Sequence, residues 1–381
     1  MDNKYLGALI GKYGVRCTPI WDPLFNQSNM LPGNITITNY KGHIVWAVRL
    51  VNYLYYPFWS DPDVNRLHFF DMPANSKIVM GSLDGYFPSR IVELPEGTCA
   101  FMGMYRGAED PRLYVWNDEL YMIVARPDVV PDKVVQVIYR FKQDLSTFDK
   151  EFTIESPNQL EKNWAPIVGK EHEFLYNPNT GSTVSLVSDA TNPERCILQG
   201  DTSFEGIQRG STQVIPSSKE TYITIVHTTW YEFLSEYRRF DYSHYLKLMT
   251  YDDENRSFVT RNIVPFRFLI PGIEFCCGIA MDEHNLYISF STWDASVFIM
   301  SIPLQVFDLV INTLKNQELP QPTDAFEMMY NSSKHEDVNN GMLLYCKYLP
   351  IGDMLNIVNG CRGRIEDNIL DSILYNRLIT Q

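Results

Sequence analysis

Five short hairpin patterns recur along the chain, and this repetition constrains the fold more than any other feature of the sequence. Each pattern is an apolar strand, a polar tip and a second strand that begins with an aromatic or aliphatic residue. Such runs, closed by turn residues, are typical of β-hairpins. The patterns lie at Ile35–Val48, Arg112–Ala125, Ala165–Tyr176, Thr212–His227 and Ile279–Phe290.

Further strand-like runs lie between the hairpins, at Val134–Phe141 and Tyr245–Tyr251, so each unit has room for three or four strands. Repeated units of about 45–80 residues favour a radial repeat over a sandwich. The sequence therefore predicts an all-β fold, a five-bladed β-propeller over residues 1–304. A pair of large β-sandwiches is the alternative.

The C-terminal part, residues 305–381, has a different pattern. Apolar residues recur at helical spacing in Leu304–Asn316, Asp353–Asn359 and Ile365–Leu378. We expect a largely helical C-terminal extension that packs on the propeller. A contact that builds a homo-oligomer is the alternative role of this extension.

Composition excludes several classes of protein. The chain has 381 residues, with 32 Lys and Arg against 46 Asp and Glu, and this acidic balance argues against a nucleic-acid partner. A hydrophobic content of 45% is too high for a disordered chain. No apolar stretch approaches the roughly 20 residues of a membrane span, and the N-terminus does not resemble a secretory signal. A cytoplasmic location is expected.

Signatures of cofactor and metal sites are missing from the sequence. The seven Cys residues are odd in number and show no CxxC spacing, which favours reduced thiols over a zinc site or a disulfide framework. Neither a GxGxxG nor a phosphate-loop motif is present, and GxSxG and HExxH are absent too. We therefore expect no cofactor and no metal.

Polar residues precede every hairpin. In a propeller the first strand of each blade lines the central channel, so residues at the same register of five blades converge on one funnel. The alternative is that these side chains are ordinary solvated turns. The expected funnel residues are Asn34, Glu109, Asp110, Arg112, Lys162, Asn163, Arg209, Ser211 and Glu274.

The funnel residues have the chemistry of a glycan-active site. Asp110 and Glu274 are carboxylates from different blades, and a carboxylic acid is what moves a proton at a glycosidic oxygen. Arg112, Lys162 and Arg209 have the charge to bind an anion. Ion pairs with neighbouring carboxylates such as Glu109 are the alternative use of these cations.

Further candidates for substrate binding have equally good structural roles. Arg49 and Asn52 end the first hairpin and either reach the funnel or satisfy buried backbone. Trp164 offers a face to a sugar ring, although a lone Trp is more often part of the core. His227 ends a predicted strand and Asp294 follows one. Each is either a funnel residue or a residue with a structural role.

Six motifs in one order carry a resemblance to a known family. They are VRLVNY (Val48–Tyr53), EDPRL (Glu109–Leu113), EKNWAP (Glu161–Pro166), GSTQ (Gly210–Gln213), IEFCCGIA (Ile273–Ala280) and Asp294 after a strand. Over roughly residues 30–300 the chain resembles the five-bladed propellers of glycoside hydrolase family 130 and related propeller domains of glycosyltransferases. That group includes inverting mannoside phosphorylases, hydrolases and β-1,2-mannosyltransferases.

The resemblance implies roles for individual residues. Asp110 matches the proton donor of the family. Arg112, Lys162 and Asn163 match positions that hold the sugar or an anion, and Glu274 matches a pocket carboxylate. The chain departs from the family at Pro32–Asn34, where relatives carry Asn-Pro-Ser, and it lacks the His-Arg-Pro segment that accompanies phosphate handling.

Together these observations predict an enzyme that forms or cleaves a glycosidic bond. An inverting glycosyltransferase or a mannoside-type phosphorylase is expected, acting on a sugar or glycan with a nucleotide sugar or a sugar phosphate as the second substrate. A binding propeller for glycans or proteins without catalysis is one alternative, and an assembly protein with a filled channel is another. The chemical surroundings of Asp110 separate these hypotheses.

Overall fold

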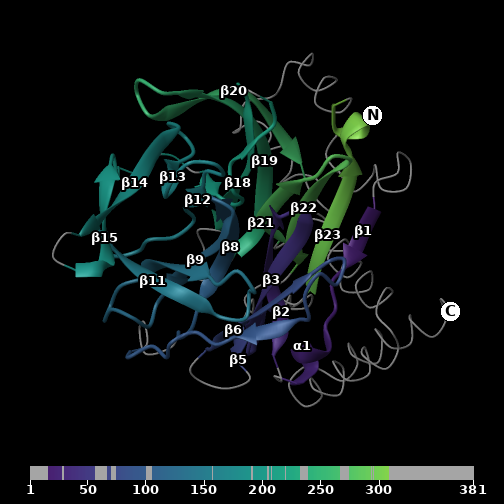
Figure 1. Cartoon of the computed structure of the whole chain (residues 1–381), viewed down its shortest axis with the longest axis vertical. Helices are drawn as coiled ribbons and strands as arrows, with labels where there is room; N and C mark the ends of the chain where they lie inside the picture. Colours follow the sequence, from purple (N-terminus) through teal and green to yellow (C-terminus); the bar gives the residue numbers. More distant parts are fainter. Residues whose placement is uncertain are drawn as a thin grey trace.

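The computed structural model describes most of the first 308 residues. The described ranges are 16–27, 30–55, 67–69, 74–99, 105–156, 158–189, 192–203, 206, 208–218, 220–231, 239–266, 274–292, 294 and 296–308. The described part is all-β, as predicted, and its longest named helix is α1 (Pro23–Gln27). Figure 1 shows the strands arranged as several sheets.

Two of the predicted hairpins are closed by turns that the sequence encodes locally. Strands β2 (Leu31–Tyr40) and β3 (His43–Val51) pair across Lys41 and Gly42, which both have positive φ. Strands β8 (Glu109–Trp116) and β9 (Glu119–Arg126) pair across Asn117 and Asp118, whose φ angles are 52° and 59°. Positive φ at both central residues is the signature of the two-residue turns that match strand twist.

The other three hairpin predictions are also confirmed. They correspond to the pairs β12 (Ala165–Pro166) with β13 (Glu173–Asn177), β17 (Ile215–Pro216) with β18 (Tyr222–Tyr231), and β21 (Glu274–Met281) with β22 (Asn285–Thr292). Both intervening runs are strands as well. The first is β10 (Val135–Phe141), and the second lies within β19 (Arg239–Asp252).

Each hairpin extends into an antiparallel meander, and we number the five meanders of the described residues in chain order. The first adds β6 (Ser76–Ser82) and β7 (Arg90–Val92), the second β10 and β11 (Phe148–Glu155), the third β14 (Ser182–Asp189) and β15 (Asn192–Gly200), the fourth β19 and β20 (Ser257–Phe266), and the fifth β23 (Ser296–Pro303).

The fifth meander is completed by the opposite end of the chain. Strand β1 (Arg16–Pro19) pairs antiparallel with β23, with Arg16 opposite Ser301 and Pro19 opposite Phe298. Pairings of β11 with β15 and of β14 with β20 join the second, third and fourth meanders into one 13-stranded sheet. Three short strands remain: β4 (Tyr53–Tyr55), β5 (Leu67–Phe69) and β16 (Arg209–Gly210).

The first strands of different meanders meet at one buried glutamine. Gln213 is completely buried; its Nε2 donates to the carbonyl of Ile37 at 2.6 Å and to that of Leu113, and its Oε1 accepts from the backbone N of Ile279 at 3.0 Å. These partners lie on β2, β8 and β21. The first strand of the fourth meander is split into β16 and β17 around Gln213, which places its side chain among the other three.

Close backbone approach at this centre requires a glycine. A Cβ on Gly278 would lie 2.3 Å from the backbone N of Ile37, so β21 packs against β2 only without a side chain there. Thr36 adds polar links, because its Oγ1 donates to the carbonyl of Cys277 and accepts from the backbone N of Leu113. The meanders are therefore joined by specific hydrogen bonds as well as by apolar packing.

The predicted C-terminal extension lies almost entirely outside the described residues. Strand β23 ends at Pro303 and residues 304–308 are helical, whereas residues 309–381 are not described. The five cysteines that are described form no disulfide with one another. Within the described residues, no helix is long and apolar enough to cross a membrane.

A buried lysine in the fourth meander gives a stability prediction. Lys247 is 3% exposed and donates to the carbonyl of Pro178, and burial lowers its pKa from 10.5 to about 8. Below pH 8 it is charged in the folded and unfolded states alike, so the full desolvation penalty applies. Between pH 8 and 10.5 the folded state loses the proton first, and stability rises with pH.

Lys247→Met is therefore expected to stabilise the fold near neutral pH. Lowering the pKa of Lys247 from 10.5 to about 8 corresponds to a free-energy penalty of about 3 kcal/mol for the charged form. Urea unfolding from pH 6 to 11 should show a larger free energy of unfolding for Lys247→Met than for wild type below pH 8. This difference should decline toward pH 10.5. Lys77→Met, at an exposed position of β6, is the matched control and should change little. A Lys247→Met variant no more stable than wild type at pH 7 contradicts the prediction.

Candidate functional site

A cavity of about 260 Å³ opens where the meanders meet, and it contains several of the predicted funnel residues. Its polar lining comes largely from the first and fifth meanders and from β8, and its apolar lining from segments next to the second and third. The lining residues are Asn34, Arg49, Tyr53, Tyr105, Glu109, Asp110, Pro127, Val134, Leu160, Lys162, Tyr242, Phe275 and Asp294.

A β-bulge directs two consecutive carboxylates into this cavity. In a regular strand neighbouring side chains point to opposite faces. The register of β8 against β9 shifts between Glu109 and Arg112, and Asp110 has a φ of 48°. Positive φ is uncommon outside glycine, although Asp tolerates it better than most residues. The bulge therefore lets Glu109 and Asp110 line the same cavity.

The segment before the bulge is fixed by the neighbouring sheet. Gly107 has a φ of 84°, and a Cβ on it would lie 2.6 Å from the backbone oxygen of Ser76. Ser76 Oγ donates to the carbonyl of Ala108 at 2.5 Å, and the backbone N of Gly107 donates to Asp128 Oδ2 at 3.0 Å. Buried Arg126 holds Asp128 in turn, with Nε 2.7 Å from Oδ1.

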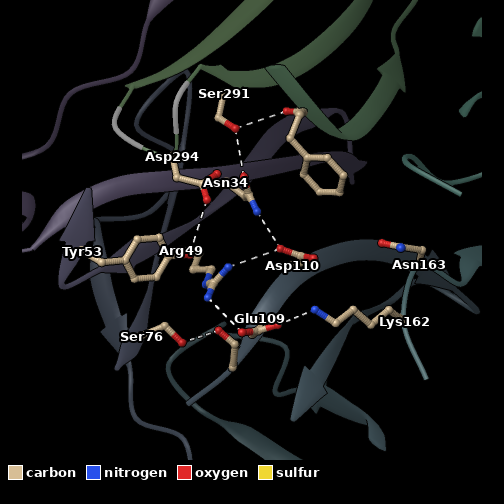
Figure 2. Close-up of polar contacts among 12 residues, drawn as sticks. Asn34, Arg49, Tyr53, Ser76, Glu109, Asp110, Lys162, Asn163, Ser291 and Asp294 are labelled. Atoms are coloured by element: carbon tan, nitrogen blue, oxygen red, sulfur yellow. Dashed lines mark hydrogen bonds and ion pairs between the residues drawn. The ribbon is translucent and has the colours of Figure 1, made fainter. Parts of the chain in front are cut away.

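One oxygen of Asp110 is held and the other is left to the cavity. Asn34 Nδ2 donates to Asp110 Oδ1 at 2.6 Å, and Arg49 Nη1 lies 3.4 Å from the same oxygen. Ser291 Oγ donates to Asn34 Oδ1 at 2.9 Å, which orients the amide (Figure 2). Within the described part of the chain, Oδ2 of Asp110 has no hydrogen bond. It is the oxygen positioned to reach a bound molecule.

Arg49 forms the base of the polar wall. It is 6% exposed, its Nη2 lies 3.3 Å from Glu109 Oε1, and its Nε has no hydrogen-bond partner among the described residues. Burial alone would lower the pKa of Arg49. The opposing effect of its neighbours is larger, so its pKa lies above the usual value; these neighbours are Tyr53, Glu109, Asp110 and Asp294. Arg49 is therefore a permanent cation at the base of the cavity.

The remaining carboxylates of the cavity are engaged. Glu109 contacts Arg49 through Oε1 and Lys162 Nζ through Oε2, at 3.0 Å. Asp294, which has a φ of 48°, accepts from Tyr53 OH at 3.4 Å. Figure 2 shows Glu109 and Asp110 between Arg49, Tyr53 and Asp294 on one side and Lys162 and Asn163 on the other.

Lys162 is presented by a buried carboxylate next to it in the chain. Glu161 is 2% exposed, and the described groups that donate to its carboxylate are all neutral. Its partners are Ser156 Oγ, Asn158 Nδ2, Trp164 Nε1 and Tyr176 OH. This anchor fixes the segment, and Lys162 then extends from it to Glu109.

The structure corrects the expected role of Arg112 in binding substrate. The side chain is 2% exposed and does not line the cavity; Nε donates to the carbonyl of Ser211 at 2.8 Å, and Nη2 donates to Asn163 Oδ1 and to the carbonyl of Gly210. Its Nη1 donates to the backbone oxygen of Asp110, not to its carboxylate. Arg112 thus joins the second, third and fourth meanders.

Other predicted residues also lie away from the cavity lining. Trp164 is 1% exposed and packs against Phe174 and Tyr176. It therefore belongs to the core, the more common role of a lone Trp, and does not present a face to a sugar. Asn52 Oδ1 accepts from the backbone N of Asn75, and Arg209 Nη1 donates to the carbonyl of Gly206.

Two more of the predicted residues form a buried pair behind the cavity wall. Ser211 Oγ lies 2.7 Å from His227 Nδ1, and the imidazole packs against Tyr242 and Phe275, which line the cavity. Glu274 begins β21 opposite Thr292, and its side chain lies outside the described part of the structure.

The aromatic and apolar lining was not predicted from the sequence. Tyr53 and Phe275 lie inside the VRLVNY and IEF motifs, so the motifs themselves were the available signal. Leu160 directly precedes EKNW. Ser291, three residues before Asp294, gives no signal by type or spacing. Among the described residues, no cluster of three or more His, Cys, Asp or Glu side chains has the geometry to hold a metal ion.

Comparisons with known proteins give structural matches only. No family model and no curated protein matches the sequence. A β-1,2-mannobiose phosphorylase from Listeria innocua is 12% identical with a TM-score of 0.47, covering 76% of this chain and 93% of that one. A mannose phosphorylase from Leishmania mexicana is 14% identical with a TM-score of 0.43, covering 74% and 86%.

A GDP-Man-dependent mannosyltransferase from Leishmania mexicana is 15% identical with a TM-score of 0.42, covering 76% of this chain and 89% of that one. At this level of similarity the function has to be argued from the cavity itself.

Proposed function

We propose that the chain is a carbohydrate-active enzyme that forms or cleaves a glycosidic bond in this cavity, with Asp110 moving the proton. The observation that carries the proposal is the placement of one carboxylate. Asp110 Oδ1 is held by Asn34 and Arg49, whereas Oδ2 has no hydrogen bond among the described residues and is the oxygen that we assign to the substrate. An oriented carboxylate with one available oxygen has the geometry of a general acid or base.

The surroundings of Asp110 favour transfer to an acceptor. Both of its polar partners, Asn34 and Arg49, donate to Oδ1, which leaves Oδ2 to accept a proton. The Oδ2 atom of ionised Asp110 accepts the proton of a hydroxyl group on the acceptor. At the same time the oxygen of that hydroxyl group bonds to the anomeric carbon of the donor sugar. The bond from the anomeric carbon to the leaving phosphate oxygen breaks, and the phosphate takes the electron pair. In the reverse direction protonated Asp110 returns the proton to the glycosidic oxygen.

A single proton-transfer residue implies inversion at the anomeric carbon. A retaining mechanism needs a second carboxylate as nucleophile. Glu109 does not meet that requirement, because Arg49 and Lys162 contact both of its oxygens. Lys162 lies at the edge of the cavity, with 37% of its side chain exposed, and supplies positive charge for an anionic leaving group. The site thus suits an inverting glycosyltransferase or mannoside-type phosphorylase.

The architecture that fits this site is a five-bladed β-propeller. The five meanders would be the blades, and β1 would close the ring by completing the last of them. The bonds of Gln213 to β2, β8 and β21 support a radial arrangement around one axis. We assign the propeller to residues 1–304 and a helical extension to residues 305–381.

A binding screen by thermal shift tests the proposal. Wild type and Asp110→Asn are heated with mannose, mannose 1-phosphate, GDP-mannose, other nucleotide sugars and phosphate. A ligand in large excess over its Kd raises the Tm. We expect a sugar phosphate or nucleotide sugar to stabilise both proteins. The absence of a shift with any sugar or phosphate would instead favour a platform without catalysis.

A further inference from the structure

A buried serine of the fifth meander is linked to Asp110 through one intervening side chain. Ser291, on β22, is 1% exposed and does not line the cavity. Its Oγ donates to Asn34 Oδ1 at 2.9 Å, and Asn34 Nδ2 donates to Asp110 Oδ1 at 2.6 Å. The hydrogen bonds thus run without a break from β22 through β2 to β8 (Figure 2). Ser291 can therefore influence Asp110 without contact with substrate.

The direction of these hydrogen bonds decides which oxygen of Asp110 can carry a proton. The hydroxyl of Ser291 donates, so the amide of Asn34 accepts through its oxygen and turns its N–H group to Asp110. Arg49 Nη1 is a second donor, 3.4 Å from the same Oδ1. A hydrogen on Oδ1 would point at groups that can only donate, so the proton that Asp110 exchanges is kept on Oδ2.

Asn34 depends on Ser291 for this orientation. Asn34 is 4% exposed and lies where the register of β2 against β3 shifts, between Pro32 and Ile35. In the described part of the chain, Asn34 Oδ1 accepts from Ser291 alone. An amide turned by half a rotation would present its oxygen to the Asp110 carboxylate, and two acceptors would then face each other. The hydroxyl of Ser291 therefore fixes which end of the amide faces Asp110.

We propose that Ser291 is a positioning residue of the reaction, which acts through Asn34 to hold Asp110 with Oδ2 available to the reacting oxygen. This inference rests on the proposed function, because it gives the proton-transfer residue a partner outside the cavity. Loss of the Ser291 hydroxyl frees the Asn34 amide and the carboxylate to turn. Misalignment of a proton-transfer group should slow the chemical step about tenfold and leave substrate binding unchanged.

Ser289→Ala is the matched control for Ser291→Ala. Ser289 lies two residues earlier on β22, on the same face of the strand, and is completely buried. Its Oγ also donates to β2, to the carbonyl of Ile35 at 2.8 Å. Each serine hydroxyl also lies near a carbonyl of β21, that of Gly278 for Ser289 and that of Phe275 for Ser291. The two variants lose equivalent bonds between the same strands, so their Tm values should fall by similar amounts.

A double-mutant cycle with Asp110→Asn tests the inference. With the donor identified by thermal shift, kcat and KM are measured for the full chain, the three single variants and Asp110→Asn combined with Ser291→Ala. We expect Ser291→Ala to lower kcat about tenfold at unchanged KM, and Ser289→Ala to keep the wild-type kcat. In the Asp110→Asn background, Ser291→Ala should lower kcat by less than about twofold, because no proton-transfer group is left to position.

Three results would overturn the inference and leave the proposed function standing, provided that Asp110→Asn alone loses its rate. They are a wild-type kcat in Ser291→Ala, an equal loss of kcat in Ser289→Ala, and a full tenfold effect of Ser291→Ala in the Asp110→Asn background. A wild-type kcat in Asp110→Asn, or no turnover of any donor by the wild-type chain, overturns the proposed function as well. The two failures are therefore distinguishable.

Discussion

Asp110→Asn is expected to lower the rate of glycosyl transfer by about 10²- to 10⁴-fold, the usual contribution of a positioned general acid or base. The reason is chemical, because an amide can neither accept nor donate the proton at the reacting oxygen. The backbone should be unaffected, since Asp110 has a φ of 48° and Asn tolerates this region at least as well as Asp. The amide oxygen can still accept from Asn34.

The measurement is a steady-state assay with the donor identified by thermal shift, with kcat and KM determined separately. The loss should fall on kcat, because the residues that hold the sugar are unchanged. Asp294→Asn is the matched control, since Asp294 lines the same cavity and also has a φ of 48°. The assignment is wrong if Asp110→Asn keeps wild-type kcat, or if Asp294→Asn loses as much.

Gln213→Met is expected to reduce the free energy of unfolding by about 5 kcal/mol. The substitution keeps the length and volume of the side chain but removes its bonds to Ile37, Leu113 and Ile279. A buried polar group that loses its partner costs about 1–3 kcal/mol, and three such groups are affected. A loss of this size is a large fraction of the stability of an ordinary domain.

Urea unfolding of Gln213→Met against Gln136→Met separates this role from the general effect of removing a buried glutamine. Gln136 is 2% exposed and so about as buried as Gln213, but among the described residues its side chain makes one hydrogen bond, from Nε2 to the carbonyl of Glu161. The control should lose about 1 kcal/mol. Similar losses in the two variants would mean that the central glutamine does not join the meanders energetically.

The hairpins could be predicted because their information is local. Lys41-Gly42 and Asn117-Asp118 are residues that accept positive φ, and the strands beside them alternate or are β-branched. The pairing of β1 with β23 could not be predicted in this way. Residues 16–19 carry no turn or repeat signal, and their partner lies at the other end of the sheet region.

The candidate site was predictable in part, and the bulge in β8 explains where prediction failed. Equal register across hairpins placed Asn34, Glu109, Asp110 and Lys162 together, and all four line the cavity. The same register placed Arg112 there as well. The shift between Glu109 and Arg112 sends its guanidinium to the backbone of Gly210 and Ser211 instead. A bulge depends on backbone geometry that residue types do not specify.

Trp164 had two possible roles in the sequence, and only the fold separates them. Its position in EKNW suggested an aromatic face for sugar, but Nε1 donates to Glu161, and the ring packs on Phe174. The Glu161 carboxylate needs buried donors, and an indole N–H supplies one while the ring fills the core. The apolar residues that do line the cavity, such as Leu160 and Tyr242, come from separate meanders, and only the fold brings them together.

The stereochemistry of the transferred sugar is the sharpest test of proton transfer by Asp110. Wild-type chain is mixed with an α-linked donor, mannose 1-phosphate or GDP-mannose, and an acceptor sugar, and the anomeric protons are followed by NMR from the start of the reaction. We expect a β-linked first product, because Asp110 moves the proton and the neighbouring carboxylate, Glu109, is held through both oxygens by Arg49 and Lys162. An α-linked first product, or no transfer from any donor that binds, would contradict it.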